Sequence, residues 1–285
     1  MSHFTRNTLL SVLFLHFVLL AGCKEKDTLA ENDIRFNTIE KTASYHFFNL
    51  SENPHCDFSV NFTYPEQIEN EKMLPKLQNK FIVAAFGEKY TGLAPREAIE
   101  RYAESYINTY KEIEPDYKTD RKTHNESEDS FASWYNYNEN ISNEIVFNRA
   151  HIIAFTNKLE TYTGGAHGAR QYTNYVINLN TGCRIDESDI FIEGFKEPIS
   201  YLLIEKIAEF NHVENVSELI EIGYFGIEEI QPNNNFLINE QGITYTFNEY
   251  EIAAYVIGAT KVLLTFDEIG LYLKKENPIA HLLRN

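Results

Sequence analysis

Apolar residues recur every three or four positions in three stretches of the chain, a spacing that predicts three amphipathic helices. In residues 76–86 the apolar side chains favour one side. Residues 95–113 begin with Pro95, which suits the first turn of a helix, and then repeat isoleucine and tyrosine at helical spacing. Residues 198–212 again carry their apolar residues on one face. We expect these helices to cover a sheet.

Other stretches alternate apolar and polar positions, as strands do. The first is residues 59–64, which Pro65 is expected to end. Aromatic and β-branched residues typical of antiparallel strands fill residues 131–138, 144–148, 150–163 and 174–185.

The remaining segments complete a predicted α+β fold of antiparallel sheets packed with amphipathic helices. The charged residues 114–130 predict a loop with almost nothing to bury. The last third predicts a strand, a turn at Gln241 and Gly242, a second strand, a short helical crossing and a final strand.

The N-terminus predicts a lipoprotein signal. An apolar run at residues 9–20 follows Arg6 and is too short to span a bilayer, which takes roughly 20 apolar residues. The sequence LAGC that follows matches the bacterial lipoprotein signal, so we expect residues 1–22 to be removed and Cys23 to be lipidated. An ordinary signal peptide with a free cysteine is the alternative. Residues 23–40 are polar and are expected to form a tether.

This signal predicts a protein of the cell envelope, anchored to a membrane by its N-terminal lipid. Lys24 follows the cysteine, where inner-membrane lipoproteins of enteric bacteria carry aspartate. An outer-membrane position is therefore expected if the bacterium has two membranes.

The charge of the chain restricts its partners. With 42 acidic and 25 basic residues, the net charge is −17 at pH 7. Nucleic acid binding requires basic patches, so the charge argues against a nucleic acid partner. A basic partner and a merely solvated acidic surface both agree with it.

Two further cysteines, Cys56 and Cys183, lie in the part that would face an oxidising compartment. A disulfide between them would constrain the unfolded chain. The alternative is two small, buried apolar side chains.

Motifs of known catalytic or cofactor sites are absent from the sequence. It contains no Gly-x-Ser-x-Gly, His-Glu-x-x-His or Cys-x-x-Cys motif and no glycine-rich phosphate loop. After residue 22, no two histidines have the i, i+4 spacing of a helical metal site. We therefore expect no cofactor and no metal.

One histidine stands out because Gly164, Gly165 and Gly168 surround it. His167 lies in a stretch suited to a hairpin or bulged connection, since glycine adopts positive φ without strain. Its imidazole could bond a turn carbonyl, contact a ligand, or act in hydrolysis with a nearby carboxylate.

A second histidine, His151, has an ordinary structural explanation. If one strand runs through residues 147–155, His151 shares parity with the apolar Phe147, Ile153 and Phe155. We then expect it at the edge of the core.

An aromatic stretch, Trp134, Tyr135 and Tyr137, is open to two interpretations. The three rings could pack in a sheet or form a platform for sugars.

The segments YTGGAHG, INLNTGCRIDESDIF and FLINEQGITYTFNEYEIAAYVIGATKVLLTFDEI together resemble the extracellular region of the RsiV-like family. That family includes an anti-sigma factor that senses lysozyme, and related modules precede some envelope polysaccharide deacetylases. The resemblance covers residues 45–275 and implies a two-part α+β module, with halves at residues 41–160 and 161–285. Neither a transmembrane helix nor a sigma-binding segment nor a deacetylase domain is expected here.

The resemblance implies a non-enzymatic binding protein, with a basic lysozyme-like hydrolase as the candidate partner. We expect the binding surface to include Tyr162, Gly164, Gly165 and His167, together with Tyr250 and Tyr255 of the 250–255 segment. The alternative partner is cell-wall glycan, bound through the platform at Trp134. A hydrolase that uses His167 is a third hypothesis.

Overall fold

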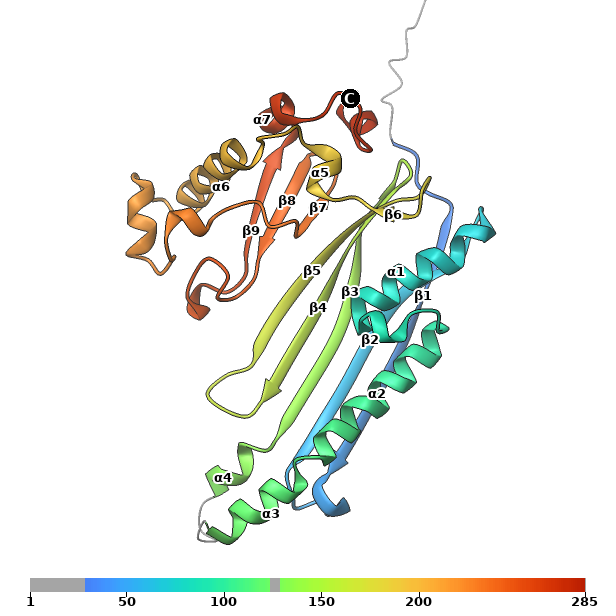
Figure 1. Ribbon diagram of the computed structural model, residues 1–285, viewed down its shortest axis with the longest axis vertical. Coiled ribbons are helices and arrows are strands. Elements are labelled where there is room, and N and C mark those ends of the chain that lie inside the picture. Colours follow the sequence, from blue (N-terminus) through green and yellow to red (C-terminus); the bar gives the residue numbers. More distant parts are fainter. Residues whose placement is uncertain (1–28, 124–128, 285) are drawn as a thin grey trace, which may run out of the picture.

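A six-stranded sheet forms the larger part of the protein (Figure 1). The structure is a computed structural model that describes residues 29–123 and 129–284, so Cys23 and the predicted signal at 1–22 lie outside the described residues. Neighbouring strands are antiparallel except β2 and β3, which run parallel. Across the sheet the strands are β1 (Ile34–His46), β2 (His55–Ile68), β3 (Tyr137–Arg149), β4 (Ile152–Thr163), β5 (Ala169–Asn178) and β6 (Cys183–Arg184).

Helices make the long connection that the parallel pair β2 and β3 requires. Two of them cover one face of the sheet, and their apolar stripes pack on β2 in a core that includes Phe58, Phe62, Leu77, Phe81 and Ile99. The helices of this connection are α1 (Leu74–Phe86), α2 (Pro95–Lys111), α3 (Glu114–Thr123) and α4 (Asp129–Ser133).

The first half of the central strand β4, residues 152–157, is buried on both faces. Ile153 and Phe155 pack towards the helices, whereas Ile152 and Ala154 belong to a second core on the opposite side. This explains the unbroken apolar run in the sequence, because a strand covered on both sides needs no polar face.

The second core belongs to the C-terminal part, which lies on the face opposite α1 and α2. It contains a small antiparallel sheet, β7 (Phe236–Ile238), β8 (Gly242–Phe247) and β9 (Thr260–Thr265). Its helices are α5 (Glu187–Ile190), α6 (Lys196–Phe210) and α7 (Phe266–Ile269). The predicted α+β class and its two-part arrangement are confirmed.

Short 3₁₀ helices occur in the connections. They are η1 (Phe47–Asn49), η2 (Glu71–Met73), η3 (Glu88–Tyr90), η4 (Val216–Ile220), η5 (Ile227–Glu229), η6 (Tyr255–Ile257), η7 (Gly270–Tyr272) and η8 (Ala280–Arg284). Across residues 29–123 and 129–284, no helix combines the length and apolar content needed to cross a membrane.

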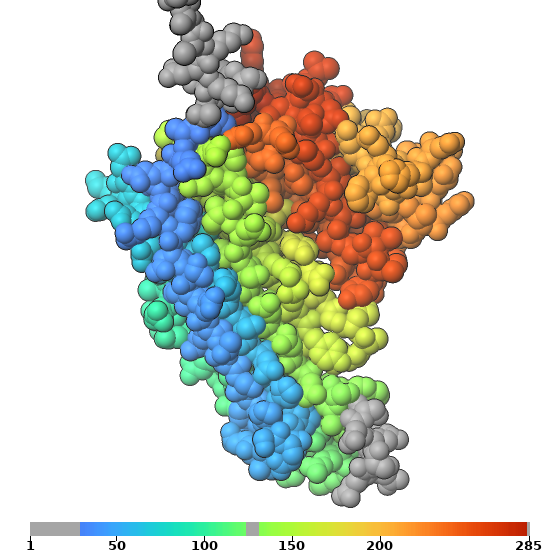
Figure 2. Space-filling view, turned by 180° about the vertical axis from the view of Figure 1, so that it is seen from behind, coloured from blue at the N-terminus to red at the C-terminus, as the bar shows by residue number. Residues whose placement is uncertain are grey.

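The C-terminal part covers only one end of its face of the large sheet, as the view from behind shows (Figure 2). Polar side chains occupy the rest of that face. Ser59 donates to Asn140 at 3.1 Å, and Asn140 donates to Glu160 at 3.1 Å, so hydrogen bonds run from strand to strand. An antiparallel sheet tolerates such a solvated face.

Two predicted boundaries differ at the N-terminal end. The predicted tether, residues 23–40, is too long because β1 begins at Ile34. Pro65 does not end its strand, since β2 continues to Ile68. The residues paired with β3 in β2 end at Asn61, so Pro65 lies where its missing N–H interrupts no bond to β3.

The charged segment 114–130 is not wholly a loop. Residues 114–123 form α3, because Tyr117 is buried against Phe47 with ring centroids 5.3 Å apart. Residues 129–133 form α4, so the strand predicted at 131–138 begins only at Tyr137.

The boundary predicted between residues 160 and 161 lies inside β4, which spans Ile152–Thr163. Most residues of the second core come from Ile185 onwards, and Phe147, Ile152, Ala154 and Val176 of the large sheet complete it. His151 is also placed differently from the prediction. It is exposed with φ 60° in a two-residue hairpin with Ala150, φ 52°, so no single strand runs through it.

Cys56 and Cys183 are both free, so of the two alternatives left open by the sequence the disulfide is not formed. Cys56 is buried near the start of β2, and Cys183 is exposed in β6 beside Lys76 of α1. Burial raises the pKa of the Cys56 thiol to about 11.

Candidate functional site

The glycine-rich stretch forms the connection between β4 and β5. Gly164 and Gly165 have φ values of 82° and 96°, in the left-handed region that favours glycine. A Cβ atom on Gly164 would clash with the backbone oxygen of Trp134. The Tyr162 hydroxyl donates to the carbonyl of Gly165 at 3.0 Å and closes the loop. The loop is therefore shaped by close packing, with His167 at its exposed side.

A second loop, between β8 and β9, meets this one. The His167 ring stacks on Tyr255, with ring centroids 3.8 Å apart and an interplanar angle of 18°. The ring of Tyr250 lies 5.7 Å from that of Tyr255, and its hydroxyl lies 3.4 Å from Nε2 of His167. We call His167, Tyr250 and Tyr255 the aromatic stack. It joins segments that are 83 residues apart in the sequence.

Exposed apolar side chains lie in the aromatic stack and in the segments joined to it. Tyr250 is 57% exposed and Val256 is 86% exposed. A third loop, which contains Phe225, is joined to the same region, because the backbone N–H of Phe225 donates to the carbonyl of Ile252 at 2.9 Å. The side chain of Phe225 is exposed. The stack with Val256 and Phe225 forms what we call the aromatic surface. Large apolar side chains that stay exposed on neighbouring loops are typical of an interaction site.

The bonds of His167 fix the expected tautomer of its ring. Nδ1 lies 2.9 Å from the carbonyl oxygen of Gly168, which can only accept, so Nδ1 carries the proton. Nε2 is then the acceptor that faces the hydroxyl of Tyr250. Among the described residues, no carboxylate is hydrogen-bonded to this ring, and no group of three or more histidine, cysteine, aspartate or glutamate side chains could hold a metal.

Side chains of the C-terminal part hold the open edge of β5. Three amides in this strand, at every second residue, donate to side-chain oxygens instead of to a neighbouring strand. Arg170 N donates to Glu249 at 3.0 Å, Tyr172 N to Asn248 at 2.7 Å, and Asn174 N to Asn235 at 2.8 Å. We call Asn235, Asn248 and Glu249 the side-chain clamp. Because two of its members directly precede Tyr250, the clamp positions the aromatic stack.

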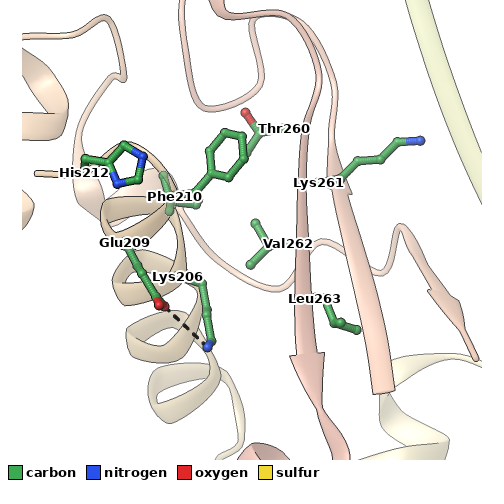
Figure 3. Close-up of a pocket in the computed structure, with 9 residues that line it drawn as sticks. Lys206, Glu209, Phe210, His212, Thr260, Lys261, Val262 and Leu263 are labelled. Carbon is green, nitrogen blue, oxygen red and sulfur yellow. Dashed lines mark ion pairs between the residues drawn. The ribbon is translucent and has the colours of Figure 1, made fainter. Parts of the chain in front are cut away.

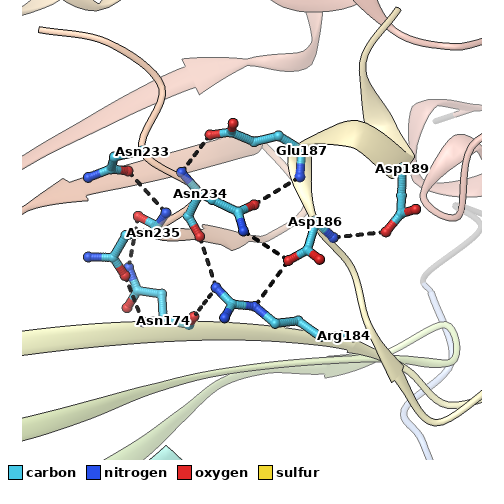
Figure 4. Close-up of polar contacts among 8 residues, drawn as sticks. All are labelled: Asn174, Arg184, Asp186, Glu187, Asp189, Asn233, Asn234 and Asn235. Atoms are coloured by element: carbon cyan, nitrogen blue, oxygen red, sulfur yellow. Dashed lines mark hydrogen bonds and ion pairs between the residues drawn. The ribbon is translucent and has the colours of Figure 1, made fainter.

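A polar network next to the clamp joins the two parts of the protein (Figure 4). Its centre is Asn234, which has φ 57°. The backbone carbonyl of Asn234 accepts from the Arg184 guanidinium at 2.9 Å, and the backbone N–H of Asn234 donates to the Glu187 carboxylate at 2.7 Å. Its side chain donates to Asp186 at 2.9 Å. Burial raises the pKa of Glu187. The network thus fixes how the C-terminal part sits on the large sheet.

A charged cluster lies between the clamp and the polar face. Glu160 accepts from Lys158 at 2.8 Å and from Arg170 at 3.0 Å. Its bond to Lys158, and secondarily that to Arg170, lowers the pKa of Glu160.

The three predicted platform residues do not form one surface. Trp134 is 62% exposed, but Tyr135 packs against Phe131 and Tyr117, and Tyr137 packs against Tyr110. Burial and, secondly, the bond from the Tyr135 hydroxyl to Asp120 raise the pKa of Tyr135 to about 12. Only Trp134 therefore presents its ring to solvent.

The structure brings together all six residues predicted for the binding surface, Tyr162, Gly164, Gly165, His167, Tyr250 and Tyr255. It adds Asn235, Asn248 and Glu249, which the sequence reasoning missed. The run of three asparagines at residues 233–235 was a visible signal, since asparagine readily bonds backbone groups outside regular structure.

Comparison with known proteins agrees with this architecture. Residues 188–267 match the family model described as "Protein of unknown function (DUF3298)". The chain is thus similar to DUF3298 proteins. Residues 51–170 match a second model, described as "Deacetylase PdaC". No curated protein matches the chain.

Two solved structures extend the similarity to most of the chain. A member of the DUF3298 family from Bacteroides fragilis NCTC 9343 is 28% identical, with a TM-score of 0.82 over 90% of this chain and 99% of that one. A DUF3298 family protein from Pseudomonas aeruginosa PAO1 is 11% identical, with a TM-score of 0.54 over 85% of this chain and 96% of that one, and shares the fold. The expected resemblance to RsiV-like proteins is thus supported at the level of an uncharacterised module of the DUF3298 and PdaC type.

Proposed function

We propose that this protein is a non-enzymatic binding protein of the cell envelope, held to a membrane by a lipid on Cys23. Its aromatic surface binds a macromolecular partner, for which a basic lysozyme-like hydrolase is the candidate. The observation that carries the proposal is the stacking of His167 on Tyr255 beside the exposed Tyr250, with rings supplied by two separate loops.

The geometry of the aromatic surface suits recognition of a protein. Tyrosine side chains offer large contact areas and lose little conformational entropy on binding. The clamp and the Tyr162 bond hold both loops before a partner arrives, and such preorganisation lowers the cost of association. The positive φ of Tyr250, 64°, keeps its ring on the surface in a backbone conformation that tyrosine rarely adopts.

Charge supports a basic partner. The chain carries a net charge of −17, and Glu249 and Glu251 flank Tyr250 in the sequence. Complementary charge speeds encounter and selects among partners more than it adds affinity. The choice of a lysozyme-like hydrolase rests on the resemblance to the RsiV-like family.

A hydrolase that uses His167 has less support. Its ring is stacked and exposed, and its nitrogens face a carbonyl and a tyrosine hydroxyl, with no carboxylate bonded to it among the described residues. General acid–base catalysis by a histidine–carboxylate pair needs such a partner within hydrogen-bond reach.

Binding of cell-wall glycan is the second candidate, and one observation favours it. Trp134 is 62% exposed and its backbone packs against Gly164, so its ring lies near the glycine loop. Aromatic rings of this kind stack on sugars. Replacing Trp134 by alanine would abolish retention on purified peptidoglycan if this candidate is right, and would leave binding of a lysozyme unchanged if the first is right.

Calorimetry tests the first candidate. The purified protein is titrated with lysozymes of several structural classes, beside variants Tyr255→Ala and Tyr250→Ala. Tyr201→Ala is the matched control, because Tyr201 is 60% exposed on α6 and Tyr250 is 57% exposed. We expect at least one lysozyme to bind, with a loss of about tenfold or more in affinity for Tyr255→Ala, as for an interface hot spot. The absence of binding tighter than millimolar by any class would remove the candidate.

A further inference from the structure

A groove separates the last turns of α6 from the strand β9 (Figure 3). It has a volume of about 570 Å³, within the range of ligand-binding clefts. The wall on α6 is formed by Lys206, Ile207, Glu209, Phe210 and His212, and the opposite wall by residues 260–263 of β9. Four consecutive strand residues line it, so the edge of the strand faces the groove.

β9 is an edge strand of its sheet, since β8 is its one neighbour in the part of the chain that the structure describes. The bond from Phe266 N to Gln241 O fixes which amides point towards β8. Amides alternate along an antiparallel strand, so the N–H groups of Lys261 and Leu263 point away from β8 into the groove. The next outward amide, that of Thr265, already donates to Glu268 at 2.8 Å.

The opposite wall keeps the groove open. The helix α6 ends in a Schellman motif, with His212 at φ 57° and the amide of Val213 donating to Ala208 at 3.1 Å. This turn directs the chain away from β9. Phe210, in the last turn of α6, remains 79% exposed at the groove.

Two lysines and two carboxylates lie at or beside the groove, and Glu209 is the more exposed carboxylate, with a side chain 76% exposed against 28% for Glu268. Lys206 is held by two carboxylates, at 3.5 Å from Glu209 and 2.7 Å from Glu268. The Lys261 ammonium lies 4.9 Å from the ring centroid of Tyr172, on the side away from α6 in Figure 3. A basic side chain on an occupant would therefore be favoured over an acidic one.

We propose that this groove binds an extended polypeptide segment, which adds to the sheet as a fourth strand beside β9. The backbone of an extended segment matches the spacing of the two outward amides, which lie on alternate residues of β9. Side chains of the segment that face α6 would pack on Phe210, those between them would lie on the side of Leu263, and a lysine or arginine would lie near Glu209. This site is separate from the aromatic surface and does not depend on the function proposed for it.

A synthetic peptide probes the groove. It is seven residues long, alternates valine with threonine and carries a lysine at each end. Binding is followed by fluorescence anisotropy, and protection of the Lys261 and Leu263 amides by hydrogen exchange. A twin peptide, N-methylated at alternate residues, keeps the side chains and removes hydrogen-bond donors on one edge. We expect protection of both amides by the first peptide and at least tenfold weaker binding of the twin.

Leu263→Pro is the decisive variant, with Leu263→Val as its control. Both side chains have three carbons, but only proline removes the outward N–H, and proline is tolerated on an edge strand at such a position. We expect Leu263→Pro to bind the peptide at least tenfold more weakly and Leu263→Val within threefold of the parent. Circular dichroism checks folding of both.

Equal binding by both variants would overturn the proposal, as would equal binding of the two peptides or an absence of amide protection. If Leu263→Pro fails to fold, the comparison of the two peptides on the unaltered protein decides.

Discussion

Asn248→Ala tests whether the side-chain clamp holds the two loops of the aromatic surface. The Asn248 side chain accepts from the amide of Tyr172 at 2.7 Å and donates to the carbonyl of Tyr172 at 3.0 Å. The variant removes both bonds. The carbonyl keeps its bond from Asn235 at 3.0 Å, whereas the amide loses the partner that the clamp supplies.

The expected size of the effect follows from these two bonds. A hydrogen bond contributes a net of about 0.5–1.5 kcal/mol to stability, so two contribute about 1–3 kcal/mol. Tyr172 is half-buried, so water can replace part of the lost hydrogen bonding. The expected loss of stability is therefore in the lower half of this range, about 1–2 kcal/mol. In a chain of this size each kcal/mol lowers Tm by roughly 2–4 °C.

Hydrogen exchange gives the local readout. A loss of about 1–2 kcal/mol corresponds to roughly 5- to 30-fold faster opening at Tyr172. Asn248→Asp is the control, because a carboxylate keeps an acceptor for the Tyr172 amide and loses only the donor. The reasoning is refuted if the Tyr172 amide exchanges equally fast in the parent and in Asn248→Ala.

Three further predictions follow. Gly164→Ala should destabilise the protein by at least about 1 kcal/mol more than Gly165→Ala in denaturant unfolding, since both have positive φ but only the first would meet a backbone oxygen; equal losses would contradict this. Burial raises the pKa of Glu187 above its ordinary 4.5, so its contribution to stability is full below 4.5 and falls as pH rises through the higher folded pKa. Glu187→Gln should therefore remove that fall from stability curves measured between pH 4 and 8, and an unchanged curve would be evidence against a raised pKa. A maleimide should label Cys183 in the native protein but Cys56 only after unfolding, and mass spectrometry that finds both blocked in the native and unfolded states would instead indicate a disulfide.

The periodic helices were predictable because packing on the sheet requires an apolar stripe. The predicted start at Pro95 is the observed start of α2, and residues 76–86 lie within α1. In contrast, α3 was missed. Its sequence is almost entirely polar, and one buried tyrosine, Tyr117, attaches it to the core. Such a helix leaves no periodic signal.

The strand β1 was partly missed for a related reason. It is an edge strand, and most of its side chains remain at least partly exposed, so residues 34–40 resemble a polar tether. Pro65 was misleading because the effect of proline depends on which edge of the strand is paired, and pairing is a tertiary property.

The candidate site, like the fold, was only partly predictable from the sequence. The two loops could be predicted from the sequence as parts of a binding surface, because glycines surround His167 and because both loops belong to the family resemblance. The clamp could not, because the bonds of Asn235 and Asn248 to β5 join residues more than 60 positions apart. Side-chain bonds to distant backbone have no local pattern.

The most direct test of the central claim is a hydrogen-exchange footprint of the full protein with the lysozyme that binds it most tightly in calorimetry. We predict that protection is concentrated in residues 162–168 and 249–257 together, the two loops that meet at His167 and Tyr255. Protection confined to other surfaces, or in one of these loops without the other, would contradict the account.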